Sequence, residues 1–302
     1  MSGGRRNGAG GELADRGIAS PAMALEGIAG KVALVTGAAR RRGIGRATAL
    51  RLAREGADVA CLDIARPYED FPGHGTASAD ELDEVVAEIE SLGRRSVGVR
   101  ADVSRWDQVH AAVAEAIGAL GGVDLVVNVA GGASLGAGAG PLLQITEAEW
   151  DLVLDVNLKG TWMVSRACAA DMLARGSGGR IVNISSQAGK RGFAMLGAYC
   201  AAKAGVILLT QVLAVELGPM GITVNAVCPG TVDTDLLNKD GQLEEALAML
   251  PGGVEGWIQR EIPVGRLETA DDVAAAVALL MSDDAAYITG EAVNVSGGQT
   301  MV

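Results

Sequence analysis

Short apolar runs alternate with longer amphipathic segments from residue 31 almost to the end of the chain. Seven runs rich in Val, Ile and Ala end in Gly, Asp, Asn or Ser, which is typical of strands bounded by turns. These expected strands cover residues 31–37, 58–64, 96–103, 123–131, 179–186, 222–230 and 291–298. Apolar residues at helical spacing fill intervals such as 45–56, 79–93 and 107–121. The pattern predicts an α/β fold, a doubly wound parallel sheet of about seven strands with helices on both faces.

The same pattern divides the chain. Residues 1–28 hold many glycines and no apolar segment, so we expect a disordered leader there and a single domain over residues 29–302. Two stretches interrupt the alternation: the Pro- and Gly-rich segment 65–79 and the segment from about 235 to 262. Segments of this length inside a compact domain are usually functional covers or loops, and we expect the second to be a lid.

Composition limits the classes of partner and the cellular location that we expect. The 302 residues hold 25 Lys and Arg against 37 Asp and Glu, a formal net charge of −12, which makes nucleic acid an unlikely partner. No uninterrupted apolar run reaches the roughly 18 residues of a membrane span, and the leader lacks the apolar core of an export signal, so we expect a cytoplasmic protein without a membrane partner. Two histidines and four separated cysteines predict buried thiols and no metal site.

A glycine-rich turn links the first expected strand to the first helix. Gly37, Gly43 and Gly45, with Ile44 between the last two, stand where backbone amides and a helix N-terminus can face a pyrophosphate. The alternative is an ordinary turn rich in glycine. Asp63 ends the second strand 20 residues after Gly43. A carboxylate there binds both adenosine ribose hydroxyls and repels a 2′-phosphate, so NAD is expected rather than NADP.

Three consecutive arginines inside this turn point the other way, because an arginine can pair with a 2′-phosphate. We expect the carboxylate of Asp63 to outweigh flexible, solvated cations. Arg40, Arg41 and Arg42 are therefore assigned to pyrophosphate contacts or to solvent, with Arg42 taken as a coenzyme residue.

From about Lys31 to Gly298 the chain resembles the short-chain dehydrogenase/reductase family. The matching segments are "TG…GIG", "ADV" at 101–103, "NVAG" at 128–131, "DVNLKG", "NISS" at 183–186, "YCAAK" at 199–203 and "PGTVDT" at 229–234. The resemblance implies a Rossmann-type domain and further coenzyme residues. Asp102 and Val103 would flank the adenine; Asn128, Ala130 and Gly131 would line a ribose; Pro229, Gly230, Val232 and Thr234 would hold the nicotinamide amide and phosphate.

The catalytic chemistry follows partly from spacing. Tyr199 and Lys203 are four residues apart on an expected helix, so both project from one face. A nearby ammonium stabilises a phenolate, which would make Tyr199 a usable proton acceptor. The family's pattern implies that Ser186 holds the substrate oxygen, that Lys203 also binds the nicotinamide ribose and that Asn157 anchors a water on a proton path. Ser185 is the competing hydroxyl, and Asn157 could instead cap or bridge a helix.

Together these residues predict an oxidoreductase that transfers a hydride between NAD(H) and a small secondary alcohol or ketone. The expected pocket is mainly apolar, with Phe193 in its wall and Gln187 as its polar contact to substrate. Two alternatives remain, an NADPH-dependent 3-oxoacyl thioester reductase and a dinucleotide-binding protein without turnover. The family also implies a homotetramer packed through the helices that carry Asn157 and Tyr199.

Three departures from the family pattern stand out. Five residues, 38–42, separate "TG" from the next glycine where three are common, and segment 65–79 is longer than usual. Both resemble a subgroup of actinobacterial-type dehydrogenases that retain NAD tightly and pass electrons to another carrier. Val129 also replaces the second Asn of the family's "NNAG". The sequence leaves open whether this chain exchanges its NAD freely.

Overall fold

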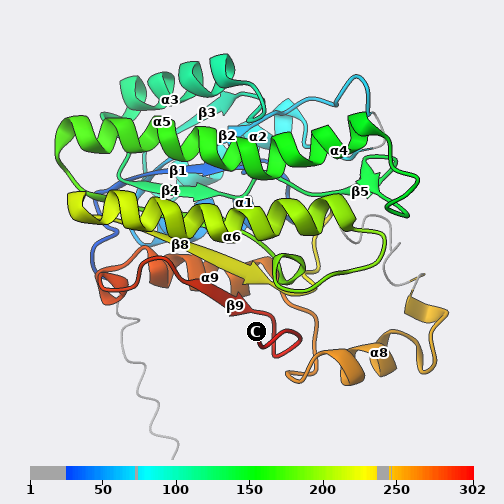
Figure 1. Ribbon diagram of the computed structural model, residues 1–302. Coiled ribbons are helices and arrows are strands. Elements are labelled where there is room, and N and C mark those ends of the chain that lie inside the picture. Colours follow the sequence, from blue (N-terminus) through cyan, green and yellow to red (C-terminus); the bar gives the residue numbers. More distant parts are fainter. Residues whose placement is uncertain (1–24, 72–73, 237–244, 246) are drawn as a thin grey trace, which may run out of the picture.

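The computed structural model describes residues 25–71, 74–236, 245 and 247–302 (Figure 1). Most of the predicted leader and part of the predicted lid therefore lie outside the described residues. The domain begins earlier than the sequence pattern indicated, because Ile28 is fully buried in the main apolar cluster.

The core is a seven-stranded parallel sheet in the order β3-β2-β1-β4-β7-β8-β9. The strands are β1 Val32–Thr36, β2 Asp58–Asp63, β3 Ser96–Arg100, β4 Leu125–Asn128, β7 Gly179–Ile184, β8 Ile222–Pro229 and β9 Ala292–Val295. Every one of the seven predicted strands is confirmed. Strand order reverses between β1 and β4, so a crevice opens beyond their carboxyl ends, where ligands of such sheets bind.

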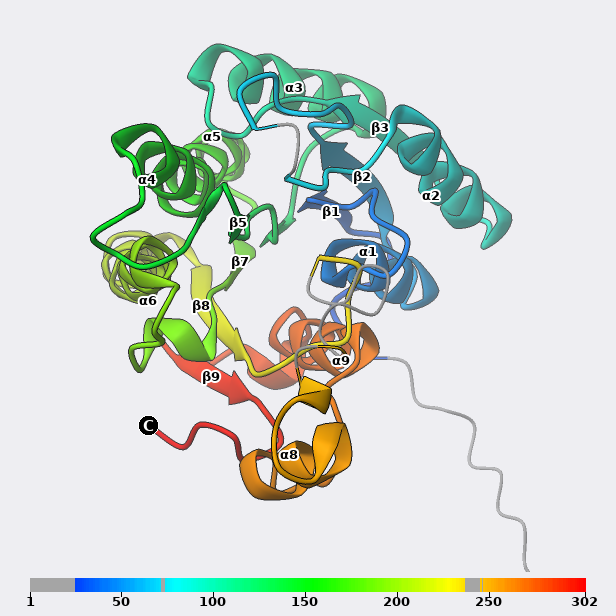
Figure 2. The same cartoon turned by 90° about the vertical axis from the view of Figure 1, so that its right-hand side faces the viewer.

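Two layers of helices cover the sheet, as predicted (Figures 1 and 2). Side chains of one layer share an apolar cluster with one sheet face, from α1 (Ile44–Arg54), α2 (Ala79–Ser91) and α9 (Ala270–Leu280). The other layer packs on the opposite face and consists of α3 (Trp106–Leu120), α5 (Gly160–Arg175) and α6 (Gly197–Leu217). Both faces of the sheet are thus buried, which explains why its strands read as continuous apolar runs.

Smaller elements shape the edge of the crevice. The two-residue strands β5 (Ser134–Leu135) and β6 (Gly138–Ala139) form a separate ladder that the sequence pattern did not reveal. A π-helical turn, Asp155–Lys159, joins α4 (Glu147–Leu154) to α5. The described part of the predicted lid includes α8 (Gly253–Glu261), which projects from the body beside the C-terminal end of the sheet (Figure 2).

Helix α6 bears on the expectation that the chain has no membrane-spanning segment. With the turn that follows it, Gly197–Met220 is long and apolar enough to cross a membrane by length and composition, with a mean hydropathy of 1.7. Only 33% of that window is buried within the chain. Polar residues such as Lys203, Gln211 and Glu216 interrupt this helix, so it is not an uninterrupted apolar run, although its mean hydropathy is high. One face of α6 packs on the sheet, while Leu208, Val212 and Val215 remain exposed on the helix.

Candidate active site

A cavity of about 680 Å³ lies at the carboxyl ends of the strands. Each of six strands brings a residue to its wall, either its last residue or one shortly after it: Gly37, Asp63, Val103, Ala130, Ser186 and Pro229. The volume falls within the range of natural small-molecule sites. The crevice predicted from strand order is therefore a formed site in this chain.

The glycine turn brings backbone to the cavity surface. Gly37 has a φ of +66°, and a side chain on it would meet the backbone of Ala130 at 3.0 Å. A side chain on Gly45 would overlap the Gly37 carbonyl oxygen. Helix α1 begins after Gly43 with no side-chain cap, so its first N–H groups remain available to a ligand. This uncapped N-terminus matches the needs of a pyrophosphate.

Asp63 sits at the edge of the cavity with a fixed carboxylate. It is 6% exposed; its Oδ2 accepts the Ala39 N–H at 3.0 Å and its Oδ1 accepts the Ala65 N–H at 3.1 Å. Burial raises the pKa of Asp63, while the two backbone N–H groups and the nearby Arg40 oppose that rise. The carboxylate is thus oriented before any coenzyme binds, as selection at a ribose requires.

The three arginines have three different surroundings. Arg40 lines the cavity, its guanidinium donates to the Gly75 carbonyl, and burial lowers its pKa. Arg41 donates through Nε to Glu84 at 2.9 Å, away from the cavity.

Arg42 corrects an expectation. Its Nη2 pairs with Asp233 at 2.6 Å and its backbone N–H with Asp235 at 3.0 Å, and it does not line the cavity. Asp233 and Asp235 hold this side chain toward the loop after β8, so Arg42 joins the glycine turn to that loop and does not point into the cavity.

Two further predicted coenzyme residues lie behind the cavity wall. The Oδ1 of Asp102 accepts the Ser104 N–H at 2.9 Å and its hydroxyl at 2.6 Å, which leaves Val103 as the lining residue. The Nδ2 of Asn128 donates to Ser165 at 2.9 Å and Asn183 at 2.8 Å. Both side chains hold the wall in place and do not line it. Of the predicted coenzyme residues, those lining the cavity are Gly37, Gly43, Ile44, Gly45, Asp63, Val103, Ala130, Gly131, Tyr199, Lys203, Pro229, Gly230, Val232 and Thr234.

Four described residues of segment 65–79 line the cavity, and the sequence analysis did not assign them individually. Tyr68, His74, Thr76 and Ala77 line the wall. His74 Nδ1 lies 2.9 Å from the Ser134 hydroxyl, and its ring centroid is 5.9 Å from that of Tyr68. Burial lowers the pKa of His74, which favours a neutral ring at pH 7. Aromatic residues within a Pro- and Gly-rich insertion were the available sequence signal.

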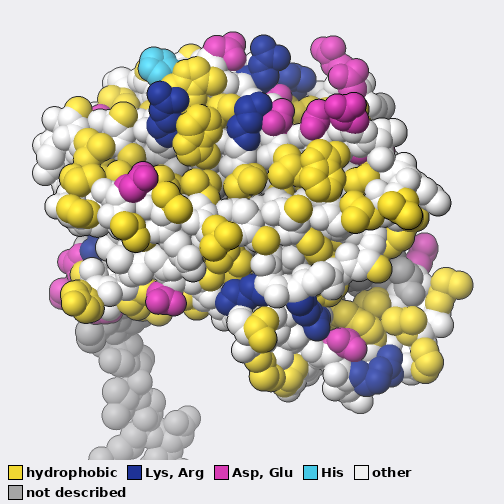
Figure 3. Space-filling model, viewed as in Figure 1, with side chains coloured by type: hydrophobic (Ala, Val, Ile, Leu, Met, Phe, Trp, Pro, Cys, Tyr) yellow, Lys and Arg dark blue, Asp and Glu magenta, His cyan; other side chains and the backbone are white. Residues whose placement is uncertain are grey.

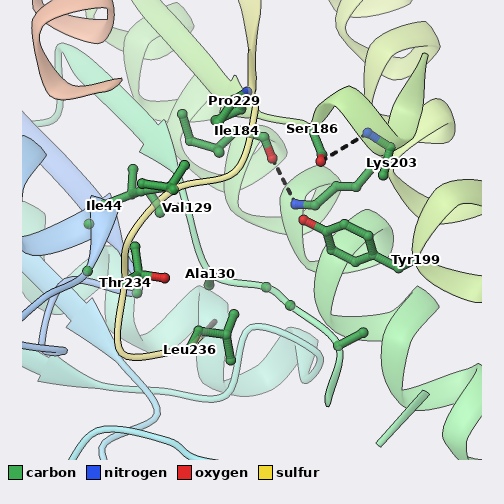
Figure 4. A pocket seen from close by; sticks show the side chains of 18 of the residues that line it. Ile44, Val129, Ala130, Ile184, Ser186, Tyr199, Lys203, Pro229, Thr234 and Leu236 are labelled. Carbon is green, nitrogen blue, oxygen red and sulfur yellow. Dashed lines mark hydrogen bonds between the residues drawn. The ribbon is translucent and has the colours of Figure 1, made fainter. Parts of the chain in front are cut away.

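Three of the four predicted catalytic residues, Ser186, Tyr199 and Lys203, lie together at the other end of the cavity (Figure 4). Ser186 follows β7, whereas Tyr199 and Lys203 come from the first turns of α6. The Lys203 Nζ donates to the Ile184 carbonyl at 2.8 Å and lies 5.5 Å from the centroid of the Tyr199 ring. The Ser185 hydroxyl donates to the Lys203 carbonyl at 2.8 Å. Ser185 thus anchors the helix, which favours Ser186 as the reactive hydroxyl.

The electrostatic balance at this triad differs from the sequence expectation. Burial is the largest effect and raises the pKa of Tyr199 to about 12, although a hydrogen bond with Ser186 opposes it. Burial also lowers the pKa of Lys203 to about 8. Desolvation therefore outweighs the stabilisation of a phenolate by the ammonium, and Tyr199 is a neutral phenol at pH 7 in this structure.

Asn157 lies in the π-helical turn and is fully buried. Its Oδ1 accepts the Gly132 N–H at 2.9 Å, and its Nδ2 donates to the carbonyls of Gly132 and Val153, both at 2.9 Å. A side chain on Gly131 would overlap Oδ1. The amide thus fixes the loop after β4 and does not line the cavity. A π-turn at such a position is common beside functional sites.

The substrate side is mainly apolar, with Phe193, Leu196, Leu236 and Trp257 in its wall. The last two come from the predicted lid. Gln187 also lines the wall, but its amide is engaged: Nε2 donates to Gln299 at 3.1 Å and Oε1 accepts from Thr300 at 2.9 Å. The polar contact assigned to Gln187 is therefore shared with residues near the end of the chain.

Comparison with known proteins agrees with this geometry. Residues 37–300 match a family model described as Enoyl-(Acyl carrier protein) reductase. A (−)-trans-carveol dehydrogenase of Rhodococcus erythropolis is 36% identical over 91% of this chain and 99% of its own length. A cyclohexanol dehydrogenase of Rhodococcus sp. is 40% identical over 90% and 96%. A carveol dehydrogenase from Mycobacterium avium, solved in complex with NAD, superimposes with a TM-score of 0.83 at 35% identity, over 91% of this chain and 99% of its own.

Proposed function

The chain belongs to the short-chain dehydrogenase/reductase family, and we propose that this NAD-dependent alcohol dehydrogenase interconverts a small secondary alcohol and its ketone by a Ser-Tyr-Lys-Asn mechanism. The observation that carries the proposal is the convergence of Ser186, Tyr199 and Lys203 at one end of a cavity whose other end presents Asp63 and an uncapped helix. Bound NAD supplies the hydride acceptor, C4 of its nicotinamide ring.

Each side chain then has one task. The hydroxyl of Ser186 holds the substrate oxygen. Tyr199 takes the carbinol proton as the C–H bond gives up its hydride, so the alcohol loses one hydride and one proton and becomes a ketone. In the reverse direction Tyr199 returns the proton to the ketone oxygen. Lys203 lies beside Tyr199 on the same face of α6, and its Nζ is held by the hydrogen bond to the Ile184 carbonyl. Asn157 holds the loop after β4 in place through its hydrogen bond with Gly132.

The high pKa of Tyr199 gives the two directions different pH dependence. A neutral phenol is ready to donate to a ketone at pH 7, whereas oxidation needs the phenolate. Since the phenolate fraction grows tenfold per pH unit below a pKa of about 12, the rate of oxidation should rise with pH. The rate of reduction should stay nearly constant up to about pH 10, because Tyr199 remains almost entirely a neutral phenol there. The decisive test is Tyr199→Phe in NADH-absorbance assays with secondary alcohols. Turnover close to that of the unmodified enzyme in a folded variant would refute the mechanism.

The thioester reductase alternative has less support. Asp63 disfavours NADPH, and the net charge of −12 disfavours docking of an acidic carrier protein. A binder without turnover has no need of the Ser186, Tyr199 and Lys203 set. A higher kcat/KM for NADPH with 3-oxoacyl thioesters than for NAD with alcohols would reverse this order.

Slow coenzyme exchange is a second proposal, and the cover formed by residues 65–71 and 74–78 favours it. His74 is hydrogen-bonded to Ser134, and Arg40 is hydrogen-bonded to Gly75. At least these two hydrogen bonds must break before a dinucleotide can leave from beneath this cover. Nicotinamide coenzyme released from purified protein by denaturation, and counted by chromatography, tests the idea. Protein that carries none and turns over freely with added NAD contradicts it.

We also propose a homotetramer that buries the outer faces of α4, α5 and α6. Large apolar side chains remain exposed there, among them Trp162 at 41%, Leu208 at 62% and Val215 at 78%. Figure 3 shows apolar side chains gathered across this side of the molecule. Light scattering after size exclusion measures the assembly, and a monomer at micromolar concentration contradicts it.

A further inference from the structure

Gln299 reaches the cavity wall from the turn after β9. It is 9% exposed, and its Oε1 accepts three hydrogen bonds: from the Thr231 N–H at 3.0 Å, from the Thr231 hydroxyl at 3.1 Å and from Gln187 Nε2 at 3.1 Å. Because a backbone N–H can only donate, the contact with Thr231 identifies which end of the amide is the oxygen. The side chain thus has a defined orientation.

The other end of this amide behaves differently. Within the described residues, Nε2 of Gln299 meets no acceptor, whereas Gln187 uses both its amide oxygen and its amide nitrogen. The planar amide directs Nε2 away from the three donors around Oε1. This nitrogen is not among the fully buried polar atoms that lack a partner, so it is accessible, and Gln299 lines the cavity, where an acceptor on a ligand can reach it.

Gln299 lies between the segment that follows β7 and the loop that follows β8. Gln187, its neighbour on one side, directly follows Ser186, which is assigned to the reacting oxygen. On the other side a Cβ on Gly230 would lie 2.8 Å from the Gln299 Oε1, so the amide rests against the coenzyme loop after β8. Apart from Ser186, Tyr199 and Lys203, the substrate wall is largely apolar, and its other charged residues, Arg191 and Glu261, are exposed. An additional donor in such surroundings can orient a polar substrate beside the reacting oxygen.

We propose that Gln299 is a substrate-positioning residue whose amide N–H binds a second oxygen on the substrate. The cavity therefore prefers alcohols that carry a hydroxyl or carbonyl close to the reacting carbon over alcohols with one oxygen. This inference rests on the proposed dehydrogenase function, because it uses the same cavity and the same Ser186.

The test compares matched substrates with NAD: cyclohexanol against cyclohexane-1,2-diol, and 2-butanol against 2,3-butanediol. In Gln299→Glu the side chain keeps an acceptor for Thr231 and Gln187 and loses the amide donor. We expect the ratio of kcat/KM, diol over mono-alcohol, to fall by about 2- to 12-fold, the range for one hydrogen bond. Gln299→Met removes donor and acceptor together and should lower the ratio as well.

Thr300→Val is the matched control. It removes the hydroxyl that donates to Gln187 at 2.9 Å, which loosens the same network but leaves the Gln299 amide intact. Its melting temperature should fall while its substrate ratio stays at that of the unmodified enzyme. A Thr300→Val ratio that falls as far as that of Gln299→Glu assigns the effect to the network and overturns the proposal.

Two other results overturn the proposal and leave the dehydrogenase function standing. One is an unchanged ratio in both Gln299 variants. The other is weaker NADH binding, measured by fluorescence titration, with an unchanged substrate ratio, since the donor would then serve the coenzyme. If the unmodified enzyme oxidises no secondary alcohol of either pair, the proposed function fails, and this inference fails with it.

Discussion

Coenzyme choice offers the sharpest prediction, because one buried carboxylate carries it. Replacing Asp63 with Asn removes the negative charge at the position expected for the adenosine ribose and leaves the shape of the side chain almost unchanged. Arg40, which lines the same cavity and interacts electrostatically with Asp63, then faces a 2′-phosphate without a competing anion. We expect NADP to become a usable coenzyme.

The magnitude follows from Coulomb's law. A unit charge on a 2′-phosphate about 5 Å from a carboxylate is repelled by about 3 kcal/mol at an effective dielectric constant of about 20. At about 1.4 kcal/mol per factor of ten, the kcat/KM ratio of NAD over NADP should fall by about two orders of magnitude in Asp63→Asn. The assay is initial-rate kinetics with each coenzyme at a saturating concentration of one alcohol.

The Asp63→Asn change should also lower the stability of the protein, and this loss must be separated from the effect on coenzyme preference. Both carboxylate oxygens of Asp63 accept backbone N–H groups, from Ala39 and Ala65, so one of them would face the new amide nitrogen. A mismatched buried donor costs about 1–3 kcal/mol of stability, which lowers the melting temperature and affects both coenzymes. The ratio between coenzymes cancels that shared loss.

Glu84→Gln is the matched control, because it removes one carboxylate from the Arg41 pair outside the cavity. Its coenzyme ratio should stay within about twofold of the unmodified enzyme, as expected for an exposed ion pair. An Asp63→Asn enzyme that is folded and keeps the original NAD preference would refute the assignment of coenzyme selection to this carboxylate.

Three further predictions concern the reaction and the stability of the site. Tyr199→Phe should lower kcat by about 10²- to 10⁴-fold, the usual contribution of an acid–base group, with NADH binding retained in fluorescence titrations. Asn157→Ala should lower the free energy of unfolding by about 1–3 kcal/mol per stranded partner, since Gly132 loses both its hydrogen bonds to the amide; denaturant titration measures it. Burial raises the pKa of Glu268 to about 8, so the folded chain holds a proton there that the unfolded chain releases above about 4.5; this contribution to stability is lost as pH rises from 4.5 to 8. Glu268→Gln should flatten that loss in melting curves, and an equal slope in both proteins contradicts the assignment.

The periodicity of the chain was sufficient to predict the sheet and the helices around it, because the central strands β1, β2 and β4 are buried on both faces and the helices that cover the sheet each have one buried stripe. Helical periodicity also predicted that Tyr199 and Lys203 lie close together, because residues four positions apart on a helix project to the same side. The raised pKa of Tyr199 could not be predicted from the sequence, because it results mainly from burial, and burial depends on residues from many parts of the chain. The roles of Asn128 and Arg42 depend on partners such as Asn183 and Asp233, which no local pattern relates to them.

The loop after β8 shows most clearly which contacts cannot be predicted from a local sequence pattern. Glu268 accepts the Gly230 N–H at 2.7 Å, and Gln299 accepts the Thr231 N–H at 3.0 Å. These partners are 38 and 68 residues away along the chain. Two adjacent backbone donors, at the end of the cavity that we propose for the nicotinamide, are thus held by two side chains that enter from different elements. If that proposal holds, a change at either side chain acts on bound ligands through the same two amides, so effects of Glu268 and Gln299 variants should not be additive.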